Sequence, residues 1–94
     1  MDRLRCVIIN RKELEIEHQL DADVLFLLNH LYLYGVRILN LDGNVNTDRI
    51  KSILKEAGQK MSESLLIASM DETLANGRAL GLPTLAFVNR ACLL

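Results

Sequence analysis

The sequence predicts a three-layer α/β domain, an open and mainly parallel four-stranded sheet with helices on both faces. Apolar runs of strand length alternate with stretches of helix length along all 94 residues. The run Leu65–Ala68 is continuously apolar, which is typical of a strand covered on both faces. From Ser64 to Val88 a strand, a helix and a strand follow one another, and this spacing predicts a parallel βαβ unit with a right-handed crossover.

The first part of the chain contributes a strand, a hairpin and a helix. Leu4–Ile9 is a β-branched run that ends at Asn10 and predicts a buried central strand. Leu14–Gln19 begins with alternating apolar and acidic residues, which indicates a hairpin arm and hence a possible small β-flap after the first strand. Asp21 or Asp23 is expected to cap the next helix. Its broad apolar face is formed by Val24, Leu25, Leu27, Leu28, Leu31 and Tyr32.

The middle of the chain contributes a second strand and a second helix. Gly35 ends the preceding helix, and Val36–Leu41 is the next strand. The following helix begins at Asn46 or Thr47 and ends at Gly58. Its apolar positions are Ile50, Ile53, Leu54 and Ala57.

The last helix has a start signal and a stop signal. Ser69 is followed three residues later by Glu72, the pattern of a capping box in which both side chains bond amides at the helix start. Gly81 and Pro83 end the helix, and Thr84–Val88 is the last strand.

Composition excludes some classes of function. A chain of this length predicts a single domain over residues 1–94. Eleven basic and twelve acidic side chains give a net charge of −1, so the basic surface of a nucleic-acid binder is missing. With four aromatic residues, the chain also lacks a platform for stacking bases.

The cysteine and histidine residues do not have metal-ligand spacing, so no metal or cofactor is expected. Cys6 lies in a predicted strand as a core residue, and Cys92 lies in an apolar tail. Two such cysteines indicate a reducing compartment. His30 is expected beside the apolar face of its helix.

The apolar stretch Val24–Leu28 is too short to cross a bilayer, and no signal peptide is present, so the expected location is the cytoplasm.

Several segments also follow the order of a known family. Leu27–Leu39 reads as helix, glycine and strand. Ile53–Gly58 and Ser62–Ser69 lead into the next turn, and Ala75–Thr84 supplies a helix and a strand. Together they resemble haloacid-dehalogenase-like (HAD) phosphatases around the second and fourth motifs, with Leu14–Gln19 at the place of the family's β-flap. The resemblance covers almost the whole chain and implies a Rossmann-like core without a cap domain and with one strand missing or reduced.

The catalytic positions depart from that family's pattern. The resemblance implies an aspartate nucleophile at the position of Asn10. It implies a general-acid aspartate at the position of Lys12. Asp42 stands where a serine or threonine is expected, and Ser69 and Thr73 replace acidic magnesium ligands. Phosphoryl transfer of this type needs a carboxylate nucleophile and a divalent ion. The implied fold is therefore kept while the implied chemistry is not.

A second alignment register is also possible. Asn40–Asn44 resembles the family's first motif, with Asn40 at the nucleophile position. The nucleophile is again an amide, and Asp42–Gly43 is also a common turn pair.

Ligands of such sheets bind beyond the carboxyl ends of the strands. The family's strand order would place the first strand beside Leu65–Ala68. The candidate crevice is then lined by Asn10, Lys12, Asp42, Ser69 and Asp71. Lys12 with the helix start at Ser69 either holds an anion or is a solvated charge beside a helix cap. Asp42 with Asp71 either holds a cation or serves as a turn residue and a helix-start residue.

The function expected from these observations is binding without catalysis. The helix Val24–Tyr34 and the tail Leu93–Leu94 are more apolar than one face of a small sheet requires, which indicates a homodimer or a protein partner. One alternative is a phosphohydrolase or phosphotransferase with an altered site that uses Asp42 and Asp71. Another is a sensor of anions or phosphorylated ligands that binds through Lys12 and Ser69.

Overall fold

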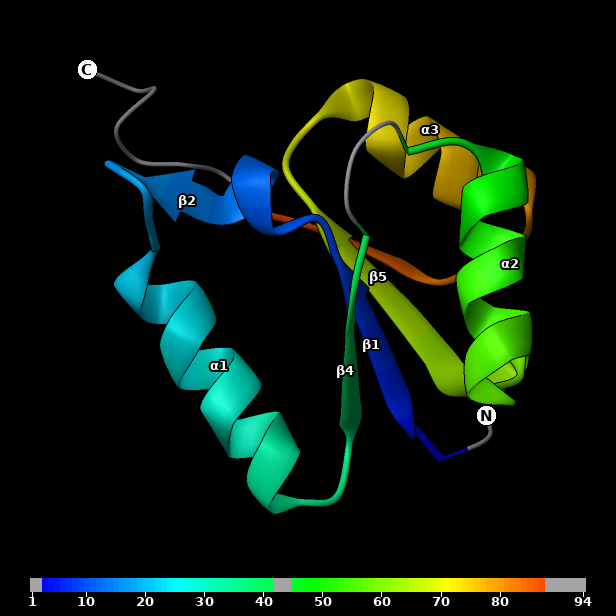
Figure 1. Cartoon of the computed structure of the whole chain (residues 1–94), viewed down its shortest axis with the longest axis horizontal. Helices are drawn as coiled ribbons and strands as arrows, with labels where there is room; N and C mark the ends of the chain where they lie inside the picture. Colours follow the sequence, from blue (N-terminus) through cyan, green and yellow to red (C-terminus); the bar gives the residue numbers. More distant parts are fainter. Residues whose placement is uncertain (1–2, 42–44, 88–94) are drawn as a thin grey trace.

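The computed structural model describes residues 3–41 and 45–87, and it has the predicted α/β architecture (Figure 1). Four parallel strands form the main sheet in the order β4-β1-β5-β6. These strands are β1 (Cys6–Ile9), β4 (Arg37–Asn40), β5 (Ser64–Ala68) and β6 (Thr84–Ala86). The helices are α1 (Ala22–Leu33), α2 (Thr47–Ala57) and α3 (Asp71–Ala79). The predicted order of elements and the central place of the first strand are confirmed.

A hairpin lies between β1 and α1, where the sequence indicated a β-flap. A 3-10 turn, η1 (Arg11–Leu14), follows β1, and the two short strands β2 (Glu15–Ile16) and β3 (Gln19–Leu20) pair antiparallel. A second 3-10 turn, η2 (Met61–Glu63), leads into β5.

The sheet is covered unequally on its two faces. Helix α1 lies alone on one face, whereas α2 and α3 cover the other (Figure 1). All four residues of β1 are buried and contribute alternately to the two sides. The core under α2 and α3 contains Cys6, Ile8, Leu41, Ile50, Leu54, Leu66, Ala68, Leu74 and Leu82. The core under α1 contains Val7, Ile9, Leu14, Val24, Leu28, Val36 and Ile67.

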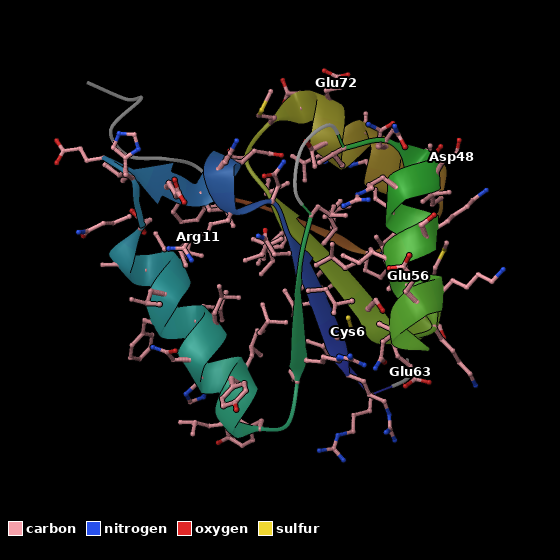
Figure 2. The ribbon with its side chains drawn as sticks, in the orientation of Figure 1. Cys6, Arg11, Asp48, Glu56, Glu63 and Glu72 are labelled. Atoms are coloured by element: carbon pink, nitrogen blue, oxygen red, sulfur yellow. The ribbon has the colours of Figure 1, made fainter. Side chains whose placement is uncertain are left out.

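Cys6 is a core residue, as predicted, and lies in the interior near the start of β1 (Figure 2). Burial raises the pKa of its thiol, while a hydrogen bond with Ser64 and the charge of Arg37 act in the opposite direction. The apolar tail that contains Cys92, Leu93 and Leu94 lies outside the described residues. Among residues 3–41 and 45–87, no helix has the length and apolar character needed to cross a membrane.

Local caps fix the ends of α1 and α2 where the sequence signals indicated. The carboxylate of Asp21 accepts hydrogen bonds from the backbone amides of Asp23 at 2.8 Å and Val24 at 3.4 Å. The side chain of Asn46 accepts from the amide of Arg49 at 2.8 Å. Asp21 and Asn46 are therefore the caps, and Thr47 is the first residue of α2.

Gly77 is where α3 comes closest to the sheet. A methyl group added there would lie 2.6 Å from Cδ2 of Leu66 and 3.0 Å from Cγ2 of Thr84. Leu66 is fully buried, so its side chain has little room to move. The absence of a side chain at this position allows α3 to pack closely against β5 and β6.

The substitution Gly77→Ala is expected to lower the free energy of unfolding by about 1 kcal/mol. In an exposed helix the same change would stabilise by about 1 kcal/mol, but here overpacking costs about 1–3 kcal/mol. Urea denaturation measures the difference. In a Leu66→Val background, which removes the contacting methyl group, Gly77→Ala should become neutral or stabilising. A stabilising effect in the parent chain would contradict the close approach.

Candidate functional site

The candidate site lies where the carboxyl ends of β1 and β5 meet. The two strands pair in parallel, with Ile9 beside Ile67, so the residues that follow them emerge at the same edge of the sheet. Asn10 follows β1 and is buried, with 8% of its surface exposed. Helices α2 and α3 begin at this same edge, as the positions of Asp48 and Glu72 show (Figure 2).

The side chain of Glu13 organises this edge. Its Oε1 atom accepts hydrogen bonds from the backbone amides of Ser69 at 3.2 Å and Met70 at 2.9 Å. Its Oε2 atom accepts from the hydroxyl of Thr73 at 2.7 Å. The turn η1 holds Glu13 in place, because the backbone amide of Glu13 donates to the backbone carbonyl oxygen of Asn10 at 3.1 Å. A carboxylate from the hairpin region thus caps α3.

The capping box predicted at Ser69 and Glu72 is wrong. Helix α3 begins at Asp71 with Met70 at the N-cap position, and no N-cap side chain bonds its amides. The hydroxyl of Ser69 donates instead to the backbone carbonyl of Glu13 at 2.9 Å. The physical reason is that Glu13 engages both groups of Ser69: its carboxylate accepts from the Ser69 amide, the bond that Glu72 would make in a capping box, and its backbone carbonyl accepts from the Ser69 hydroxyl.

The structure brings together only part of the predicted crevice. Asn10 and Ser69 lie at the shared edge, as expected. Lys12 and Asp71 are exposed, and neither lines the pocket there. Asp42 lies outside the described residues, so the predicted pairing of Asp42 with Asp71 stays a prediction.

The two backbone amides just before α3 already have an anionic partner. The backbone N–H groups of Ser69 and Met70 both donate to the Glu13 carboxylate. An anion bound there would have to displace a carboxylate of the chain itself. The geometry therefore gives no support to an anion site built on Lys12 and Ser69.

Asn40, the nucleophile position of the second alignment register, has a structural contact. It is the last residue of β4, and its side-chain oxygen accepts a hydrogen bond from the backbone amide of Arg11 at 3.0 Å. This contact joins η1 to the edge strand of the sheet. The other residues of that register, 42–44, lie outside the described part of the chain.

A pocket of about 430 Å³ opens at the carboxyl edge of the sheet. It is lined by Asn10, Glu13, Val45, Asn46, Met70, Glu72 and Thr73. Two carboxylates, two carboxamides, one hydroxyl and two apolar side chains line it, and none of its described lining residues is a lysine or an arginine. Residues 3–41 and 45–87 contain no group of three or more His, Cys, Asp or Glu side chains placed to hold a metal ion.

The sequence analysis found Asn10 but assigned no role to Glu13. The sequence positions of Glu13 and Met70 contain a signal for this contact. Glu13 lies four residues after β1, and Met70 lies two residues after β5. If these strands are parallel neighbours, an acidic residue after one strand and free helix amides after the other meet at one edge. The missing information was the turn η1, which directs the carboxylate toward α3.

No family model, characterised protein or solved structure matches this chain. The assignment of its function therefore depends on the geometry of the chain itself.

Replacing Glu13 by Ala should lower the free energy of unfolding by about 2 kcal/mol, because two backbone amides and one hydroxyl lose a charged acceptor. Chemical denaturation monitored by circular dichroism provides the measurement. The neighbouring substitution Lys12→Ala is the matched control and should change stability by less than about 0.5 kcal/mol, because Lys12 is exposed. Equal effects of the two substitutions would show that the carboxylate is not a significant cap.

Proposed function

We propose that this chain is a HAD-like domain without phosphatase chemistry that acts by self-association through helix α1. The observation that carries the proposal is the outward face of α1, which is apolar although it faces away from the sheet. Phe26, Tyr32 and Leu33 are 75%, 71% and 81% exposed. Exposed apolar patches on small domains are typical of interaction sites.

The apolar side chains of this face run along the whole helix. Leu25 and Tyr34 are also exposed, at 45% and 68%. The ring of His30 lies between two aromatic rings, with centroids 6.3 Å from Phe26 and 5.0 Å from Tyr34. Aromatic side chains bury a large area at a low entropy cost and are enriched at protein interfaces. The stripe therefore resembles the core of an interface more than a solvated helix face.

A second copy of the same chain is the partner that fits this face. Between Ala22 and Leu33 the sequence has one acidic side chain, Asp23 in the first turn, and one imidazole side chain, His30 in the last. In an antiparallel pair of α1 helices, the two apolar stripes contact each other. Asp23 of each copy then lies near the end of the other helix that carries His30. Like charges do not meet in that arrangement. Burial of the stripe also adds apolar contact to a small core.

The edge of the sheet supports the non-catalytic part of the proposal. Asn10 is the buried residue after β1, the position at which the HAD resemblance requires a carboxylate nucleophile, and a carboxamide is a poor nucleophile. Lys12 holds the position of the acidic residue and is exposed to solvent. The strand order β4-β1-β5-β6 is compatible with that resemblance, because β1 lies next to β5.

Sedimentation equilibrium tests the association. The parent chain should be a dimer at micromolar concentration, and Phe26→Glu or Leu33→Glu should raise the dissociation constant by about thirtyfold, as expected when a central apolar contact is lost. Both residues are exposed, so the fold should be retained, and glutamate is a good helix former. The control Lys51→Glu changes an exposed residue of α2 and should leave the dimer intact.

A parent chain that remains a monomer would contradict self-association through α1. A dimer that is insensitive to both α1 substitutions would place the contact elsewhere. A monomer that captures a different protein, with capture lost in Phe26→Glu, would identify α1 as a surface for another partner.

A second experiment tests the absence of phosphatase chemistry. With magnesium present, hydrolysis of p-nitrophenyl phosphate should not exceed the rate without protein, because the residue after β1 is an amide. The same assay on Asn10→Ala provides the reference. Magnesium-dependent hydrolysis that is lost in Asn10→Ala but kept in Lys12→Ala would contradict the proposal and favour the altered phosphohydrolase.

A further inference from the structure

The side chain of Asn10 is an unusual feature of the pocket. It is more than nine-tenths buried and lines the cavity. The backbone carbonyl of Asn10 accepts a bond from Glu13, but within the described part of the chain its carboxamide has no hydrogen-bond partner. Among the described residues, no polar side-chain atom is shut off from solvent without a hydrogen-bond partner, so the polar atoms of this carboxamide remain accessible from the cavity. A carboxamide in this state, at the wall of a cavity, is available to a ligand.

The charge of the pocket selects the kind of ligand. The carboxylates of Glu13 and Glu72 line it, and none of the other lining residues that the structure describes is cationic. Glu13 already accepts three hydrogen bonds from Ser69, Met70 and Thr73. Glu72 has no hydrogen bond or ion pair with any described residue. An anion would be repelled from this wall, whereas a cation would be attracted to it.

The remaining walls limit the size and character of the ligand. Val45 and Met70 add apolar surface. The side-chain oxygen of Asn46 caps α2, which leaves its amide hydrogens for a ligand. A volume of about 430 Å³ is at the small end of the range of ligand pockets. Such a pocket fits a small molecule with a donor-rich charged end and a short aliphatic body.

We infer that this pocket binds a small organic cation, an aliphatic amine or guanidine. The cationic group lies against the carboxylate of Glu72 and donates to the carboxamide oxygen of Asn10, and its aliphatic part contacts Val45 and Met70. The site is separate from the α1 face, so the inference does not depend on the proposed self-association.

Agmatine, which carries a guanidinium group and an amine on a four-carbon chain, is the probe. Titration followed by two-dimensional NMR should shift the side-chain amide signals of Asn10, and calorimetry gives the dissociation constant. Asn10→Ala and Glu72→Gln should each weaken binding about tenfold, as expected for the loss of a hydrogen bond to a charged group or of its charged partner. Asn10→Ala removes no hydrogen bond within the described residues, and Glu72 is exposed, so both variants should fold.

Asp71→Asn is the matched control, because Asp71 lies in the same helical turn and is exposed but does not line the pocket. This variant should bind agmatine within about twofold of the parent chain, as expected for an exposed charge that does not line the pocket. The neutral diol 1,4-butanediol should not bind measurably. Stronger binding of inorganic phosphate than of agmatine, no binding of agmatine, or equal weakening by Asp71→Asn and Glu72→Gln would each overturn the inference.

Discussion

The carboxylate of Glu13 at the start of α3 is the contact on which the carboxyl edge of the sheet depends. The first amides of a helix have no partners within the helix and carry a partial positive charge. Glu13 places a carboxylate at this end of α3 and accepts from the amides of Ser69 and Met70, the two residues before the helix, 56 and 57 residues away. The same side chain joins η1 to the β5–α3 unit and supplies one wall of the pocket. The side chain of Glu13 therefore contributes both to the stability of this edge and to the chemical character of the pocket.

That chemistry differs from what an intact phosphatase edge would offer. A phosphate site at the end of parallel strands combines free amides with bound cations or basic side chains. Here the two amides just before α3 donate to the carboxylate of Glu13, and the buried residue after β1 is an asparagine. The edge is therefore a source of acceptors and negative charge. This arrangement suits a ligand that brings its own donors and positive charge.

The unequal covering of the sheet gives the molecule its second distinctive surface. Two helices share one face, while α1 alone covers the other. Val24 and Leu28 of α1 are buried against the sheet, yet Phe26 and Leu33 on other sides of the helix are also apolar. The sheet accounts for the first pair only. The second pair stays exposed in the described part of the domain, and this exposure is the physical basis on which we propose association through α1.

Local patterns in the sequence determined the order of the elements, the parallel sheet and the ends of α1 and α2. Asp21 and Asn46 bond amides two or three residues away, so a short window of sequence contains both partners. The start of α3 was different, because Ser69 and Glu72 carry the pattern of a local cap that the fold does not use. Only the tertiary structure decided that Glu13 approaches the start of α3, that Lys12 and Asp71 stay outside the pocket, and that Asn10 lines the pocket with most of its surface buried. The physical reason is distance along the chain: hydrogen bonds between residues more than fifty positions apart depend on how β1 and β5 are paired and how η1 turns, and no local pattern records that geometry.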